Sequence, residues 1–230
     1  MQRSLALVIA LMVALPVSMA SFYASAISVD FRHEYKNDSQ KHASRMKMGG
    51  SPTKNLSMSL ELKFKSPTGG FMDGVEATGA EIDTGYKFKL ADEWELIPGM
   101  PVEFSGDNAT YKPQLRLTYK PLSVDGLSIS ARYRLDVKPH ESVKRFRHRY
   151  TANLGYKHNR WAYALELNQY YAADGNYHLY DNGRSNYENN LTVRYSQGKW
   201  SPWFEVGDVS VSATSDKREL RSRVGIKYQF

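Results

Sequence analysis

Three short segments of the sequence carry two arginines separated by one residue, at positions 132–134, 147–149 and 221–223. Residues two apart on a β-strand point to the same face and lie about 7 Å from each other. A guanidinium is always charged and can hold a carboxylate through two parallel hydrogen bonds. If these segments are strands, each one presents a short ladder of binding groups suited to an acidic chain.

The segments that must position these arginines alternate polar and apolar residues. Leu127, Ile129 and Ala131, for example, alternate with Ser128 and Ser130. A period of two is typical of a strand with two different faces. The sequence predicts twelve such strands, near residues 27–35, 41–49, 56–65, 75–88, 94–105, 111–119, 127–137, 147–156, 161–171, 184–195, 200–211 and 218–230.

Alternation alone also permits a soluble β-sandwich with one wet face. The predicted connections, however, alternate between short and longer ones, as do the periplasmic turns and outer loops of membrane barrels. Aromatic residues gather beside the short turns, where a barrel has its interfacial girdle. They are Tyr86, Phe88, Trp94, Tyr119, Tyr156, Trp161, Tyr195, Trp200, Tyr228 and Phe230. We therefore predict an all-β fold, a twelve-stranded antiparallel transmembrane β-barrel over residues 27–230.

The first 26 of the 230 residues differ from the rest. Arg3 precedes an unbroken apolar run over 5–15, and the segment 24–26 (Ala-Ser-Ala) matches a signal peptidase site, with a site after Ala20 as second choice. A membrane anchor would need about twenty apolar residues. Residues 1–26 are therefore predicted to be a signal peptide that is removed on export. The remaining chain has a net charge of about +6, and the mean hydropathy of −0.56 for the whole chain excludes a helical membrane bundle.

If the apolar residues face lipid, their alternating partners line the lumen. The predicted pore-lining, substrate-binding residues are Arg32, Arg45, Lys47, Arg116, Arg132, Arg134, Arg147, Arg149, Arg221, Arg223 and Lys227. The last strand of a closed barrel pairs with the first, so these residues form two clusters on opposite walls. Acidic residues of the intervening strands, such as Glu81, Glu103, Glu166 and Glu205, are expected to separate the two clusters. Twelve strands leave a narrow lumen, and charged walls select ions by sign.

The same residues permit a second interpretation of the lumen. Arginine, glutamate and aspartate side chains would then pair across a plugged lumen and only stabilise the barrel. The segregation of the two signs into sectors favours the open pore, although the boundaries of the sectors are expected to pair.

Several motifs resemble one known family of outer-membrane channels. They are the segments 28–34 (Ser-Val-Asp-Phe-Arg-His-Glu), 111–116 (Tyr-Lys-Pro-Gln-Leu-Arg), 132–134 (Arg-Tyr-Arg), 202–210 (Pro-Trp-Phe-Glu-Val-Gly-Asp-Val-Ser) and 221–230 (Arg-Ser-Arg-Val-Gly-Ile-Lys-Tyr-Gln-Phe). In order and spacing they resemble the oligogalacturonate-specific porin (KdgM-type) family, which also includes the sialic-acid-inducible porins. The resemblance implies a monomeric twelve-stranded channel for acidic oligosaccharides. Its basic pore positions match Arg32, Arg116, Arg132, Arg134, Arg221 and Arg223 best.

Other kinds of chemistry find little support in the sequence. The chain has no cysteine, and its six histidines show no metal-binding spacing. His33 and His148 fall in the lipid-facing register beside no obvious nucleophile, so an enzyme is not expected. The basic run 144–149 is interpreted as a strand entrance, not as a nucleic-acid site. We expect no cofactor, no metal and no nucleic-acid partner.

Three hypotheses for the function follow. The first is passive, anion-selective diffusion of acidic oligosaccharides through the outer membrane of a Gram-negative bacterium, with oligomers of uronate, alginate and sialate all open as substrates. The second is a non-conducting outer-membrane barrel that adheres to polyanions such as lipopolysaccharide or host glycans. The third is a soluble periplasmic β-sandwich that binds acidic glycans. Outer-membrane lipid and lipopolysaccharide are the expected surroundings of a monomer under the first hypothesis.

Overall fold

The computed structural model describes residues 27–67, 70–139 and 145–230. The predicted signal peptide lies outside the described residues and stays a prediction. No helix in the described ranges is long and apolar enough to cross a membrane.

The described chain forms fifteen β-strands that make up twelve barrel-spanning segments. The strands are β1 (Ser28–Lys36), β2 (Lys41–Gly50), β3 (Leu56–Ser66), β4 (Glu76–Tyr86), β5 (Phe88–Lys89), β6 (Trp94–Gly99), β7 (Val102–Ser105), β8 (Asn108–Tyr111), β9 (Gln114–Tyr119), β10 (Leu127–Lys138), β11 (Arg145–His158), β12 (Trp161–Ala172), β13 (Ser185–Tyr195), β14 (Trp200–Ser210) and β15 (Arg218–Gln229). All twelve predicted stretches appear, because alternation of polar and apolar residues is strong along each of them.

Two of the predicted stretches are interrupted where a proline lies in the strand. The stretch 94–105 divides into β6 and β7 before Val102, next to Pro101, and the sixth stretch divides into β8 and β9 next to Pro113. Proline has no N–H to give to the ladder. The chain stays connected across the gap, because the Lys112 backbone N–H donates to the Pro101 carbonyl at 2.8 Å.

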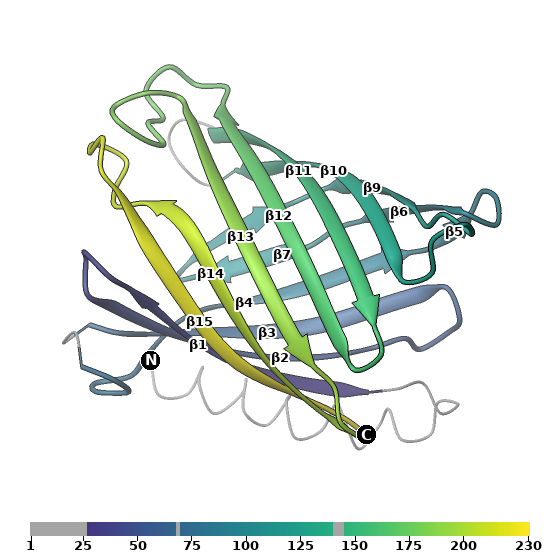
Figure 1. Ribbon diagram of the computed structural model, residues 1–230. Helices are drawn as coiled ribbons and strands as arrows, with labels where there is room; N and C mark the ends of the chain where they lie inside the picture. The colour runs from purple at the N-terminus through teal and green to yellow at the C-terminus, as the bar shows by residue number, and fades with distance from the viewer. Residues whose placement is uncertain (1–26, 68–69, 140–144) are drawn as a thin grey trace.

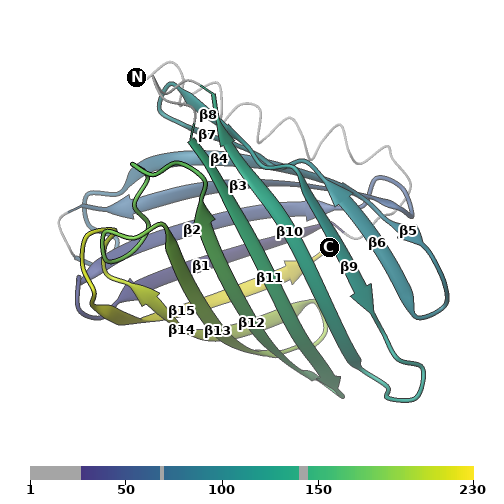
Figure 2. The ribbon, with the colours of Figure 1, turned by 90° about the horizontal axis from the view of Figure 1, so that it is seen from above.

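The sheet closes on itself. Every pairing is antiparallel, and the closing one joins the first strand to the last, with Val29 opposite Tyr228 and Arg32 opposite Gly225. The walls formed by β10–β11 and by β15–β1–β2 face each other, and Figure 2 shows β10 and β11 in front of β1 and β2. Closure leaves no exposed sheet edge, which is what a sheet needs in lipid.

The connections fall at two ends of the barrel, seen at the right and the left of Figure 1. We call the end with the C-terminus and the turns 51–55, 120–126, 159–160 and 196–199 the turn end, and the other end the loop end. The loop-end connection 106–107 is shorter than expected because β8 starts at Asn108, and Gly106 supplies the positive φ of 58° that this tight turn uses. The longest connection, 173–184, is held to the loop 211–217 by Asn182 N–H donating to the Ala213 carbonyl at 3.0 Å.

Burial in this molecule is inverted relative to a soluble protein. On β15 the apolar Leu220 and Val224 are 53% and 54% exposed, whereas Arg221 between them is 6% exposed. Five hydrophobic residues are buried among those described, against fourteen polar or charged ones. The apolar side chains therefore cover the outside of the barrel and the charged ones fill its inside, as lipid requires.

Aromatic pairs ring the turn end of the outer face. Trp94 packs on Tyr119, Trp161 on Tyr195 and Trp200 on Tyr228, with ring centroids 4.7, 4.9 and 4.5 Å apart. In each pair the two rings belong to directly opposed residues of neighbouring strands. Amphipathic aromatic rings favour the depth of the lipid headgroups, so this ring is the predicted girdle.

A substitution at Gly225 tests the packing of the barrel interior. A Cβ at this position would collide with the indole of Trp203. We expect Gly225→Ala to lower the free energy of unfolding by about 2 kcal/mol, because overpacking forces neighbours off their preferred geometry. Urea unfolding in lipid vesicles measures this. Gly175→Ala is the control, since a Cβ there meets nothing within 4 Å; equal effects of the two substitutions would contradict the packing.

Candidate pore lining

Side chains of strands that are not neighbours meet on one face of the sheet, which identifies that face as the inside. Arg221 on β15 donates to Asn190 Oδ1 on β13 at 2.7 Å, across β14. Lys63 on β3 lies 2.6 Å from Glu103 on β7, across β4. Contacts of this kind need the concave side of a curved sheet. The eleven basic residues predicted from the sequence share the alternation register of these inner side chains.

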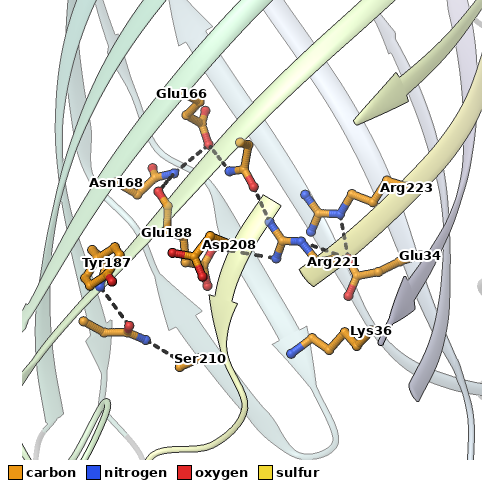
Figure 3. Close-up of polar contacts among 12 residues, drawn as sticks. Glu34, Lys36, Glu166, Asn168, Tyr187, Glu188, Asp208, Ser210, Arg221 and Arg223 are labelled. Atoms are coloured by element: carbon orange, nitrogen blue, oxygen red, sulfur yellow. Dashed lines mark hydrogen bonds and ion pairs between the residues drawn. The ribbon is translucent and has the colours of Figure 1, made fainter. Parts of the chain in front are cut away.

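Two arginines of β15 extend into a group of carboxylates (Figure 3). Arg223 Nε lies 2.6 Å from Glu34 Oε2, and its Nη1 lies 2.6 Å from Glu205 Oε1. Arg221 lies 3.7 Å from Glu188 Oε2 and 3.9 Å from Glu34 Oε2. Three carboxylates from three other strands thus neutralise these two guanidinium groups.

The opposite wall repeats this arrangement on β10 and β11. Asp136 lies between two arginines, with its carboxylate oxygens 2.8 Å from Arg134 Nε and 2.5 Å from Arg147 Nη2. Arg149 Nη2 lies 3.4 Å from Glu166 Oε1. Buried carboxylates are stable only when they are paired or hydrogen-bonded, so these contacts hold the arginines in place as well.

The sector expected to be acidic is neutralised by lysines. Lys112 Nζ lies 2.5 Å from both Glu81 Oε2 and Glu103 Oε2, and Lys63 contacts the same two glutamates at 3.3 and 2.6 Å. Lys112 is only 4% exposed. The predicted segregation into basic and acidic sectors is therefore less complete than expected, because long lysine side chains from β3 and from the β8–β9 break reach the glutamates.

The predicted basic residues divide into two groups by their partners. The paired arginines, which form ion pairs with carboxylates, are Arg45, Arg134, Arg147, Arg149, Arg221 and Arg223. The unpaired cations, which form no ion pair within the part of the chain that the structure describes, are Arg32, Lys47, Arg116, Arg132 and Lys227, together with Lys157 and Arg194, which were not predicted. The unpaired group is available to a ligand without breaking an ion pair, although Arg132 Nη2 does donate to Thr151 Oγ1 at 3.2 Å.

The two groups occupy different depths of the barrel. On β2, β10 and β15 the unpaired cation is nearer the turn end than the paired arginine of the same strand: Lys47 against Arg45, Arg132 against Arg134, and Lys227 against Arg223. The loop half of the lumen is therefore richer in ion pairs and the turn half richer in cations without one, although the unpaired Arg32 lies directly opposite the paired Arg45.

Two cavities open beside the unpaired cations. One of about 330 Å³ is lined by Lys47 and Lys227, and one of about 400 Å³ by Arg32, Arg194 and Trp203. Sequence reasoning missed Arg194 and Trp203 as inner residues. Alternation within their own strands is the signal that could have found them, since the neighbours of Trp203 at 202 and 204 are exposed and face outward.

The histidine prediction was wrong in one respect. His33 does lie beside a nucleophile on the outer face: its Nδ1 is 3.0 Å from Ser44 Oγ, and its Nε2 is 2.9 Å from His42 Nδ1. Antiparallel pairing of β1 with β2 places His33 opposite Ser44, which is 11 residues away in sequence. Phe71 and Met72 of the loop 67–75 contact this group from outside. No cluster of three or more possible metal ligands occurs among the described residues.

Comparison with protein families identifies the chain's relatives. The family model described as "Oligogalacturonate-specific porin protein (KdgM)" matches residues 20–230. A protein of Salmonella typhimurium called YiiY, named as uncharacterized, is 34% identical over 218 residues, which cover 90% of this chain and 92% of the relative. The oligogalacturonate-specific porin KdgM of Dickeya dadantii is 29% identical over 228 residues, covering 93% of this chain and 95% of the relative.

Solved structures share the fold. A NanC porin structure aligns with a TM-score of 0.77 at 20% identity and covers 88% of this chain and all of that one, a likeness of fold alone. A KdgM porin in complex with disordered oligogalacturonate aligns with a TM-score of 0.65 at 25% identity and covers 88% of this chain and 99% of that one.

The buried lysine cluster gives a test of the inner face. We expect Lys112→Met to lower the free energy of unfolding by about 3 kcal/mol, because it leaves two glutamates in the lumen with one fewer cation. Lys120→Met is the matched control, since Lys120 forms a single ion pair with Glu95 and is half exposed, and it should cost less than about 1 kcal/mol. Urea unfolding in vesicles checks both values. An equal loss of unfolding free energy in the two variants would show that the ion pairs of Lys112 stabilise the barrel no more than a surface ion pair does.

Proposed function

The chain belongs to the oligogalacturonate-specific porin (KdgM) family and is an outer-membrane porin, and we propose that it conducts acidic oligosaccharides by passive diffusion through an anion-selective, arginine-lined pore. In outer-membrane barrels the short turns face the periplasm. The turn end is then the exit of the pore and the loop end its entrance from outside.

The unpaired cations carry this proposal. A sugar carboxylate that enters the lumen meets guanidinium and ammonium groups that form no ion pair with a carboxylate of the described chain. A charge-assisted hydrogen bond to such a group is roughly twice as strong as a neutral one. Arg116 and Arg132 lie directly opposite each other on β9 and β10, and Arg32 lies on the facing wall, so an extended chain between the walls has binding partners on both sides.

Several weak binding sites arranged along the pore would allow the oligosaccharide to leave as well as to enter. A channel must bind its cargo strongly enough to admit it and weakly enough to release it. Displacement of an internal carboxylate by one of the sugar would leave that internal carboxylate without its cation, so the paired arginines of the loop half bind the cargo only weakly. The unpaired cations of the turn half would then draw the chain inward, and the cargo leaves by exchange between neighbouring sites.

The comparisons support acidic oligosaccharides as the class of substrate. The relative in Dickeya dadantii is named as specific for oligogalacturonate, and a related porin was solved in complex with oligogalacturonate. A polymer with one carboxylate on every sugar matches a wall that presents one cation on every second residue. Transport of this kind needs no covalent step, so we assign the chain no enzymatic activity, and we expect it to act as a monomer surrounded by outer-membrane lipid and lipopolysaccharide.

The charge of the inner wall can be reversed to test selectivity. In planar bilayers under a salt gradient, we expect the natural protein to give an anion-selective reversal potential and trigalacturonate to block its current. Arg116→Glu with Arg132→Glu changes the lumen charge by four and should shift the reversal potential toward cation selectivity while the barrel still assembles, because neither arginine forms an ion pair with a described residue. A cation-selective natural channel, or one that trigalacturonate does not affect, would overturn the proposal; so would purified, folded protein without unitary conductance.

A matched variant distinguishes the effect of charge on the pore wall from the effect of the overall charge of the protein. Arg160→Glu with Lys199→Glu makes the same change of charge in two turns at the turn end, outside the strands. Surface charges at the pore mouth are screened within about 10 Å at 0.1 M salt. This variant should shift the reversal potential much less than the wall variant does.

A further inference from the structure

Four residues from neighbouring strands form one row across the inner face. Arg194 on β13 lies opposite Trp203 on β14, Trp203 lies opposite Gly225 on β15, and Gly225 lies opposite Arg32 on β1. Strands in a sheet are about 4.8 Å apart. The indole of Trp203 is therefore flanked by two arginines, one strand away on one side and two strands away on the other.

Trp203 differs from the other three tryptophans of the chain. Trp94, Trp161 and Trp200 lie in the outer girdle and are 39%, 44% and 53% exposed, whereas Trp203 is 8% exposed and faces the lumen. An aromatic ring on the inner wall serves no purpose in membrane anchoring. Its position in the lumen needs another explanation.

The indole of Trp203 is held in a fixed position. Its Nε1 donates to Asp30 Oδ2 on β1 at 2.9 Å, so the ring spans the whole width of β15. Gly225 makes this possible, since any Cβ at that position would enter the ring. Asp30 in turn accepts a hydrogen bond from Arg45 Nη2 at 2.9 Å. A ring fixed in this way loses little further entropy when a ligand packs on it.

The row borders the cavity of about 400 Å³ in the turn half of the barrel. Its other wall consists mainly of small inner residues, Ser128, Gly155, Ala162, Ala164 and Thr192. Small side chains on that wall leave the space that the arginines and the indole face. The cavity is also lined by Arg45, Lys157, Tyr156, Tyr163 and Glu205, and the Glu205 carboxylate is already paired with Arg223 at 2.6 Å.

The two arginines of the row carry unused hydrogen-bond donors. Arg32 Nε and Arg194 Nε are buried and have no hydrogen-bond partner, as is also true of Nε in the paired Arg45, Arg134 and Arg221, but Arg32 and Arg194 form no ion pair with a described residue either. Buried polar groups in proteins are nearly always hydrogen-bonded, and a buried donor without an acceptor is costly. Two such guanidinium groups at one cavity point to an anionic ligand.

We propose that this cavity is a binding subsite for an acidic sugar segment, with Arg32 and Arg194 each donating to a sugar carboxylate beside the fixed indole of Trp203. The subsite rests on the proposed function, because it assumes that acidic oligosaccharides enter the lumen. Pockets that combine an aromatic wall with a few placed polar groups give both affinity and orientation. Its place in the turn half makes it one of the last sites that the cargo passes before release, ahead of the cavity lined by Lys47 and Lys227.

Fluorescence of Trp203 tests the subsite directly. The variant Trp94→Phe, Trp161→Phe, Trp200→Phe leaves Trp203 as the single tryptophan. Titration of this variant in detergent with trigalacturonate should change the Trp203 emission with saturation, and titration with maltotriose, a neutral trimer, should not. Equal responses to the two trimers would show that carboxylates are not recognised here.

Substitution of the arginines tests their role. In the single-tryptophan background, Arg32→Gln and Arg194→Gln should each raise the dissociation constant for trigalacturonate roughly tenfold, since a hydrogen bond to a charged group contributes about 1.5 kcal/mol or more. Arg160→Gln, in an exposed turn, is the matched control and should leave it unchanged. Heat-modifiable mobility on unboiled gels confirms that every variant is folded before it is titrated.

Current block in bilayers distinguishes failure of the subsite from failure of the proposed function. If trigalacturonate does not block the natural channel at all, the proposed function fails. If it blocks the natural channel and the Arg194→Gln channel equally, and the Trp203 emission does not change, acidic sugars pass the lumen without using this subsite. A block that Arg194→Gln weakens about tenfold, together with the emission change, supports the subsite.

Discussion

Compensation of charge inside a closed barrel is the constraint on which the rest of this structure depends. Lipid outside the sheet forces apolar side chains outward, and the strict alternation of a strand then sends every second, charged residue into a narrow lumen. A charge removed from water is costly unless a partner offsets it. Asp136 between Arg134 and Arg147, and Glu34 between Arg221 and Arg223, show how the chain meets this requirement.

Compensation of the basic side chains by carboxylates is less complete in the turn half of the lumen. Most of the ion pairs lie in the loop half, where they fix the guanidinium groups, although the paired Arg45 lies directly opposite the unpaired Arg32. The turn half holds Arg32, Arg132 and Arg194 without carboxylate partners among the described residues. Stability and recognition are thus divided along the pore axis, since the paired residues hold the barrel and the unpaired ones are left for an anion. The indole of Trp203 lies in the half where recognition is concentrated.

Much of the fold could be predicted from single stretches of sequence, and the departures have particular causes. All twelve spanning stretches follow from a local pattern, but Pro101 and Pro113 break two of them because proline leaves the ladder without a donor. The neutralisation of Glu81 and Glu103 was not foreseen, since it depends on how far Lys63 and Lys112 reach across a strand. The contact of His33 with Ser44 was missed for the same reason: it follows from the register of a hairpin, which no single stretch contains.

The sequence by itself determined which residues face lipid and which face the lumen, because the side of a side chain on a strand depends only on its position along that strand. It also determined that the inner face is rich in arginine. The tertiary structure alone decided which of those arginines are already satisfied. Ion pairing depends on distances between side chains of different strands, and these are set by the register and curvature of the closed sheet. Arg194, Trp203, Gly225 and Arg32 come from four strands between positions 32 and 225, and only closure of the barrel brings them into one row.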